Sequence, residues 1–69
     1  MHLKERIENN IAIITLDGTL QNEPDAILLR EAVHRYMGNN TIQVIFDLGN
    51  LTYINSWGLG LLVALLSMI

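Results

Sequence analysis

Ser56 is the side chain best placed for chemistry, because it stands where a long apolar segment is about to begin. It lies in the run Asn55-Ser56-Trp57-Gly58-Leu59-Gly60, which follows a short extended stretch. A serine at the start of a helix can accept a hydrogen bond from a backbone N–H group of the first turn. We therefore expect Ser56 to be the N-cap of a helix formed by the C-terminal segment.

The other reactive residue types form no catalytic or metal-binding set. The chain has no cysteine, no P-loop and no Ser-His-Asp set at a usable spacing. His2 and His34 lack metal-ligand spacing and are expected at the surface. We expect Asp47 to satisfy loop amides and Asp17-Gly18 to form a turn. The sequence therefore predicts no enzyme, no metal and no cofactor.

Composition limits the classes of partner and the compartment. The chain has 69 residues, a net charge of −3 and only 16% charged residues, and its four cationic side chains are scattered. Because no basic stripe can neutralise phosphates, nucleic acid is not an expected partner. The absence of cysteine favours a reducing compartment, and the charged N-terminus is unlike a signal peptide. We expect a cytoplasmic protein.

Hydrophobic spacing predicts two strands, then a helix. Residues 2–8 alternate as a half-exposed strand, Asn9-Asn10 suits a tight turn, and residues 11–16 form a β-branched strand that Asp17-Gly18 ends. Residues 22–37 carry one apolar face at helical spacing, with Asn22 as the cap, Pro24 in the first turn and Gly38-Asn39-Asn40 as the stop.

A third strand and a second helix follow. Residues 41–48 are almost continuously apolar, which is typical of a central strand covered on both faces. Gly49-Asn50 is expected to turn the chain, and residues 51–54 to form a short extended return. The order of elements predicts an α/β fold with a β-α-β unit.

The last segment is apolar throughout except for Ser67. A bilayer span needs about 20 apolar residues, and the 13 residues from Trp57 are too few to cross a membrane. Full burial of so many large apolar side chains is worth on the order of 15–30 kcal/mol, so the segment must pack on something. We expect it to cover the sheet, to contact another chain, or to contact parts of a larger protein.

The central region resembles the STAS domains, the sulfate-transporter and anti-sigma-factor-antagonist modules. The resemblance lies in Val44-Ile45-Phe46-Asp47-Leu48, the return to Ile54, and then Asn55-Ser56-Trp57-Gly58-Leu59-Gly60 opening an apolar helix. Residues 14–20 are similar to the end of the family's second strand. The resemblance implies a mixed β-sheet with helices packed on it and a single partial domain over residues 1–69, incomplete at its C-terminal part.

The same resemblance implies a phosphoswitch. In bacterial members, a partner that is both anti-sigma factor and serine kinase phosphorylates the serine that matches Ser56, and a phosphatase resets it. The unmodified module binds that partner and thereby controls transcription that depends on a sigma factor. The implied partner-binding residues are Gly18, Leu20, Gln21, Asn22, Asn55, Trp57 and Gly58.

Two other functions stay open. Asn55 and Gln21 stand where the family usually has acidic residues, and Trp57 replaces a small residue. These three positions favour a non-phosphorylated scaffold module of a membrane transporter or lipid-transport complex. The apolar C-terminal helix favours a truncated chain that self-associates as a homodimer or a higher oligomer.

Overall fold

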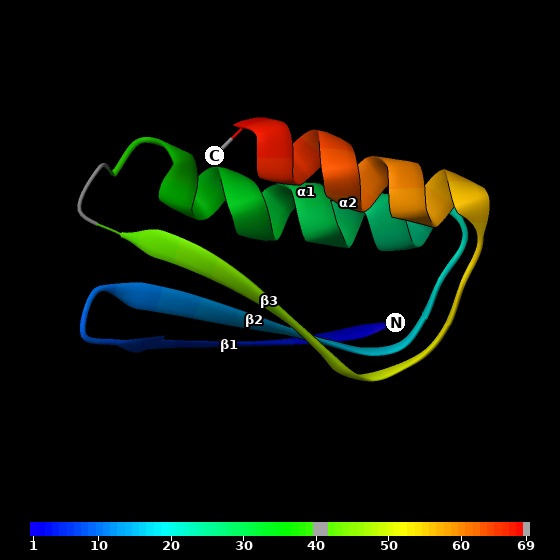
Figure 1. The fold of residues 1–69 in the computed structure, drawn as a ribbon, viewed down its shortest axis with the longest axis horizontal. Helices are drawn as coiled ribbons and strands as arrows, with labels where there is room; N and C mark the ends of the chain where they lie inside the picture. The colour runs from blue at the N-terminus through cyan, green and yellow to red at the C-terminus, as the bar shows by residue number, and fades with distance from the viewer. Residues whose placement is uncertain (40–41, 69) are drawn as a thin grey trace.

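A three-stranded mixed sheet carries two helices on one of its faces (Figure 1). The computed structural model describes residues 1–39 and 42–68. The elements follow one another as β1 (His2–Glu8), β2 (Ile11–Leu20), α1 (Glu23–Met37), β3 (Gln43–Ile54) and α2 (Ser56–Met68). This is the α/β fold with a mixed sheet that the sequence predicts.

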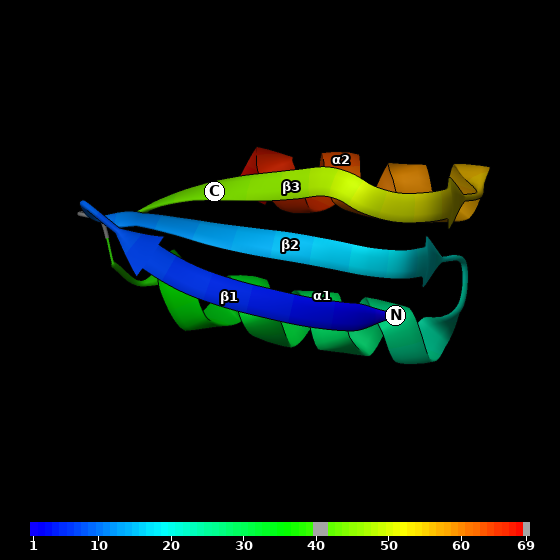
Figure 2. The same cartoon turned by 90° about the horizontal axis from the view of Figure 1, so that it is seen from below.

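The strand order is β1-β2-β3, so β2 is the central strand (Figure 2). β1 and β2 are antiparallel and joined by the predicted turn, in which Asn9 and Asn10 have φ angles of 51° and 65°. Asparagine adopts such angles more readily than most residues, which explains the pair at this position. β2 and β3 are parallel, and α1 connects them across one face of the sheet.

The prediction that Asp17-Gly18 ends the second strand is wrong. β2 continues to Leu20, and Asp17 and Gly18 still pair with Asn50 and Leu51 of β3. Gly18 has a φ of +105°, which a residue with a Cβ rarely adopts. The dipeptide therefore marks an irregularity within the strand, where the register with β3 shifts on either side of it.

The predicted central strand with a turn and a return is also corrected. β3 lies at the edge of the sheet and runs without interruption through Gly49-Asn50 to Ile54. The extra residues are absorbed as bulges against β2, and the Asp47 carboxylate accepts the Gly49 N–H at 2.9 Å beside one of them. One face of β3 is open, and Ile45 is 47% exposed. Thr41, which the sequence assigned to this strand, lies outside the described residues.

α1 forms where and why the sequence predicts. Asn22 caps it by accepting the Asp25 N–H at 3.1 Å, and Pro24 lies in the first turn. The helix ends at Gly38, whose φ of −83° shows that this glycine does not take the left-handed conformation. Asn40, the last residue of the predicted stop, lies outside the described residues.

The core lies between the sheet and the two helices. It consists of alternate residues of β2 together with the inner faces of α1 and α2: Ile14, Leu16, Leu20, Leu29, Ala32, Val33, Leu62 and Leu65. On α2 this burial covers one side of the helix. Five large apolar side chains of α2 stay between 42% and 57% exposed: Trp57, Leu59, Val63, Leu66 and Met68.

A polar contact ties β1 to the end of α1. Glu5 accepts hydrogen bonds from Arg35 and, at 2.7 Å, from the hydroxyl of Tyr36. The Arg35 hydrogen bond is the main reason that the pKa of Glu5 lies below its ordinary value of 4.5. The bond with Glu5 likewise raises the pKa of Tyr36 above 10.0.

Candidate functional site

Two loops meet at the end of the sheet where β2 and β3 finish. Leu20 and Ile54 are register partners at the ends of these strands, so the Gln21-Asn22 loop and Asn55 lie side by side. The Asn55 side-chain amide donates to the Gln21 carbonyl at 3.3 Å and joins the two loops. Both helices begin here, because each follows one of these parallel strands.

Asn55, and not Ser56, caps α2. Its side-chain oxygen accepts the Gly58 N–H at 2.8 Å, and its carbonyl accepts the Leu59 N–H at 2.9 Å. The helix begins at Ser56, so the prediction that Ser56 is the N-cap is wrong by one position. Asparagine caps helices as well as serine does, so residue type alone did not distinguish Asn55 from Ser56.

Gly58 lets α2 approach the end of β2 closely. A Cβ at this position would lie 2.4 Å from the Leu20 carbonyl oxygen and 3.1 Å from the Ile54 side chain. Only a glycine fits such a contact without moving the helix. Gly58 therefore fixes how near the Ser56 loop lies to the Gln21 loop.

Ser56 is exposed at the first helical position of α2. Helix geometry leaves the first N–H groups without intrahelical acceptors, and the Asn55 side chain engages that of Gly58. The N–H groups of Ser56 and Trp57 remain at the positive end of the helix dipole. The Trp57 ring beside them is 42% exposed.

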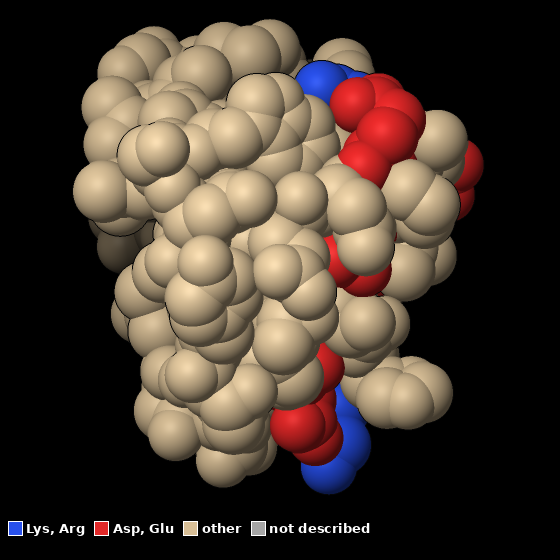
Figure 3. Space-filling view, turned by 90° about the vertical axis from the view of Figure 1, so that its right-hand side faces the viewer, with Lys and Arg blue, Asp and Glu red and all other residues tan. Residues whose placement is uncertain are grey.

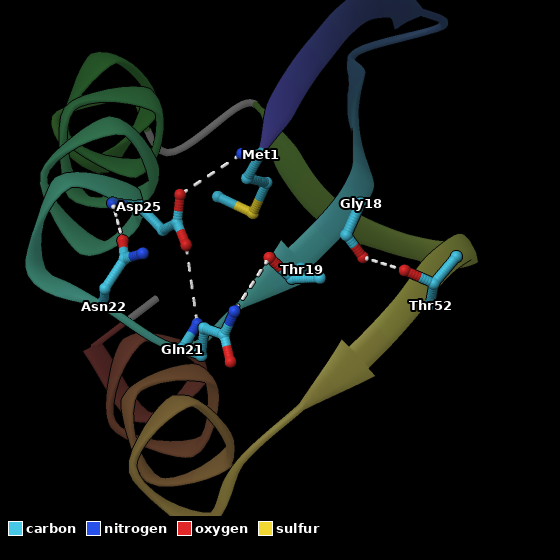
Figure 4. Close-up of polar contacts among 7 residues, drawn as sticks. All are labelled: Met1, Gly18, Thr19, Gln21, Asn22, Asp25 and Thr52. Atoms are coloured by element: carbon cyan, nitrogen blue, oxygen red, sulfur yellow. Dashed lines mark hydrogen bonds and ion pairs between the residues drawn. The ribbon is translucent and has the colours of Figure 1, made fainter.

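The neighbouring loop is held by Asp25, as Figure 4 shows. This carboxylate is only 5% exposed, accepts the Gln21 N–H at 3.5 Å and pairs with the Met1 amino group at 3.3 Å. The Gln21 side chain donates to the Thr19 hydroxyl at 3.5 Å. These contacts fix the backbone at Gln21 while its side chain stays exposed.

The structure separates the seven predicted partner-binding residues into two groups. Leu20 and Gly58 are buried, so they position the loops and do not offer a side-chain surface. The other five are exposed or half-buried: Gly18, Gln21, Asn22, Asn55 and Trp57. Gly18 lies within β2, where it pairs with Leu51, and not in the loops beside Ser56. Sequence reasoning missed Thr52, whose hydroxyl donates to the Gly18 carbonyl at 2.9 Å across the strands.

Charge is distributed unevenly at this end of the molecule. Figure 3 shows charged side chains gathered along one side, with uncharged atoms over the rest. No Asp, Glu, Lys, Arg or His follows Asp47 in the sequence, so α2 and the second half of β3 carry no charged side chain. His2 and His34 are exposed, and the described residues contain no group of acidic or histidine side chains that could hold a metal ion.

The fold is similar to that of the anti-sigma factor antagonist SpoIIAA. The unphosphorylated form of the anti-sigma factor antagonist SpoIIAA is similar to this chain at a TM-score of 0.74 and 16% identity, over 97% of this chain. The phosphorylated form of SpoIIAA, a Bacillus cell fate determinant, matches 97% of this chain at a TM-score of 0.73 and 16% identity. This chain spans 62% and 61% of the lengths of those two chains.

No family model and no curated protein matches the sequence. Within the described residues, neither helix is long and apolar enough to cross a membrane.

Proposed function

We propose that this chain is an anti-sigma factor antagonist module whose binding to an anti-sigma factor is switched by phosphorylation of Ser56. The observation that carries the proposal is an exposed serine at the first position of a helix, between two loops joined by Asn55 and Gln21. Residues 1–69 would form a single, partial domain of this class, acting in the cytoplasm and performing no catalysis itself.

The fold can accept a phosphate at Ser56. A phosphoserine carries about −1.5 to −2 charges, and the N-terminal end of α2 favours negative charge there. Because Asn55 and not Ser56 provides the cap, modification of Ser56 would leave the capping hydrogen bond to Gly58 intact. The switch would therefore act on the surface and not on the stability of the fold.

The unmodified surface suits a protein partner with an apolar pocket. Trp57 is half-exposed beside Ser56, and large aromatic side chains commonly anchor interfaces. When the partner binds, a phosphate on Ser56 would have to give up its hydrating water without gaining an opposite charge. The free-energy cost of that desolvation would exceed the free energy gained from the apolar contact at Trp57. The phosphorylated form would therefore release an anti-sigma factor kinase, and a phosphatase would restore binding.

Binding of the cognate anti-sigma factor kinase tests this proposal, with calorimetry as the measurement. We expect Ser56→Asp to weaken binding at least tenfold and Ser56→Ala to keep it. Ser67→Asp is the matched control, since Ser67 is exposed on the same helix at its other end. Unchanged affinity of Ser56→Asp would overturn the proposal.

A second function is favoured by the polar groups that flank Ser56. Asn55 is neutral, and its side chain is used structurally for both the cap and the bridge to Gln21. A non-phosphorylated scaffold module attached to a membrane transporter or lipid-transport complex needs only this fixed geometry and Trp57. In that case no kinase would modify Ser56, and Trp57→Ala would still abolish partner binding.

We also propose that the chain self-associates, as a homodimer or a higher oligomer, through the apolar α2. The observation that supports this proposal is the exposure of large apolar side chains on this helix.

A further inference from the structure

Asp25 places a carboxylate inside the fold, next to the loop that borders the candidate site. Among residues 1–39 and 42–68 it is the one buried charged side chain, at 5% exposed. Burial of a carboxylate is costly unless an opposite charge or hydrogen-bond donors compensate for the lost water. Here the Met1 amino group lies 3.3 Å from Oδ1, and the Gln21 N–H donates to Oδ2 at 3.5 Å (Figure 4).

The start of α1 does not account for a buried carboxylate. Asn22 already caps this helix by accepting the Asp25 N–H at 3.1 Å. An acidic side chain in the first turn favours the helix dipole, and Glu23 serves that purpose from an exposed position. The inward direction of the Asp25 carboxylate is therefore explained by its contacts with Met1 and Gln21.

The contacts of Asp25 continue to the candidate site. The Gln21 N–H donates to Asp25, and the Gln21 carbonyl accepts the Asn55 side-chain amide at 3.3 Å. Asn55 in turn accepts the Gly58 N–H at 2.8 Å and so caps α2. A continuous series of polar contacts thus joins the buried Asp25 to the helix start that presents Ser56.

We propose that Asp25 is a positioning residue for the Ser56 site. Its carboxylate holds the Gln21 backbone, and the Gln21 carbonyl in turn holds Asn55 and the first turn of α2. Loss of the charge would free the Gln21 loop and let the start of α2 shift, while the core between the sheet and the helices stays packed. The effect of Asp25 on partner recognition rests on the function proposed above, and its effect on the loop does not.

Amide hydrogen exchange of the full chain, followed residue by residue by NMR, tests this inference without any partner. The change is Asp25→Asn, which removes the charge at almost unchanged volume. We expect the Gly58 amide to exchange about tenfold faster relative to the Ile14 amide in the core of β2, because the cap opens locally. Glu23→Gln is the matched control, since it removes an exposed carboxylate from the same turn of α1 and should leave this ratio unchanged.

A merely structural role of Asp25 would accelerate exchange at Gly58 and Ile14 equally, and that result would overturn the proposal. The same change of ratio in Glu23→Gln would also overturn it.

Asn55→Asp tests the route of the effect. A carboxylate at this position keeps an acceptor for the Gly58 N–H but has no N–H to donate to the Gln21 carbonyl. On this background Asp25→Asn should no longer change the exchange ratio, because residues in one hydrogen-bond network have non-additive effects. An undiminished effect would overturn the proposed route.

Should Asp25→Asn lose its helical signal, Asp25→Ala replaces it with the same expectations, because alanine leaves no polar side chain to bury. Calorimetry with the cognate anti-sigma factor kinase then measures recognition, which we expect Asp25→Asn to weaken by roughly 3- to 30-fold. Unchanged affinity beside a changed exchange ratio would overturn the effect on recognition. An unchanged chain that does not bind would contradict the proposed function alone, since the exchange ratio decides the role of Asp25.

Discussion

Asn55 takes the capping role that the sequence analysis assigned to Ser56, and it also joins two loops. It caps α2, its carbonyl accepts the Leu59 N–H, and its amide reaches the Gln21 carbonyl in the neighbouring loop. Ser56 is thereby left without a structural duty and is free to serve recognition. The Ser56 hydroxyl is exposed beside a cap that a neighbouring residue provides.

Asn55→Ala should therefore destabilise the fold, and Ser56→Ala should not. Loss of the cap costs about 1 kcal/mol, while substitution of an exposed residue usually changes stability by less than about 0.5 kcal/mol. Urea unfolding followed by circular dichroism measures both. A larger loss for Ser56→Ala than for Asn55→Ala would show that the cap is misassigned.

The two glycines of α2 give a matched pair of substitutions. Gly58→Ala puts a methyl group 2.4 Å from the Leu20 carbonyl oxygen, so the helix must move away from β2. We expect a loss of about 1–3 kcal/mol from this overpacking. Gly60→Ala meets nothing in the described chain and should gain about 1 kcal/mol from helix propensity.

Urea unfolding of both variants checks this pair. Equal stability of the two variants would contradict the close approach at Gly58.

At the scale of elements, β1 is held to α1 by a polar contact at its middle. Glu5 contacts Arg35 and Tyr36, and its side chain is 23% exposed. Ion pairs this open to water contribute little on their own. Their pH dependence is nevertheless a sensitive probe of whether β1 and α1 are packed as described.

The pKa of Glu5 is lowered in the folded chain, chiefly by the Arg35 hydrogen bond. A group with a depressed folded pKa contributes stability above its unfolded pKa, and that contribution is lost as the pH falls through the folded pKa. We expect Glu5→Gln to be less stable than the unchanged chain at neutral pH and equally stable in acid. Unfolding free energies across this range measure it, and a pH-independent difference would contradict the contact.

The sequence predicts α1 and the β1–β2 turn correctly because local chemistry decides both. Asn22 and Pro24 specify a helix start, and Asn9-Asn10 permits positive φ. β3 could not be predicted in this way. Gly49-Asn50 has the composition of a turn, but parallel pairing with β2 on both sides of it turns the same residues into a bulge.

The edge position of β3 has a similar cause. A continuous apolar run such as residues 43–48 looks the same whether one or both faces are covered, because burial depends on neighbours that the run does not specify. The loops that carry the candidate site were predicted from the same local signals that placed the helices. Which of the two residues Asn55 and Ser56 caps α2 depends on hydrogen-bond geometry, and residue types alone did not predict it.

At the scale of the whole molecule, the charged side chains are all confined to one part of the chain. The first 47 residues hold every charged side chain, and the exposed apolar surface of α2 follows them. Ser56 lies where these two regions meet, at the end of the sheet where both helices begin. Under the proposed function, a phosphate placed there would add charge to the half of the chain that has no charged side chain.

Phosphate transfer by the cognate anti-sigma factor kinase tests this central claim most directly. The full chain is incubated with the kinase and ATP, and the modified residue is mapped by mass spectrometry. The chain contains two serines, so Ser67 serves as an internal control. We predict one phosphate on Ser56 of the unchanged chain and none on Ser56→Ala; no phosphate on Ser56, or transfer to Ser67 instead, would contradict the phosphoswitch.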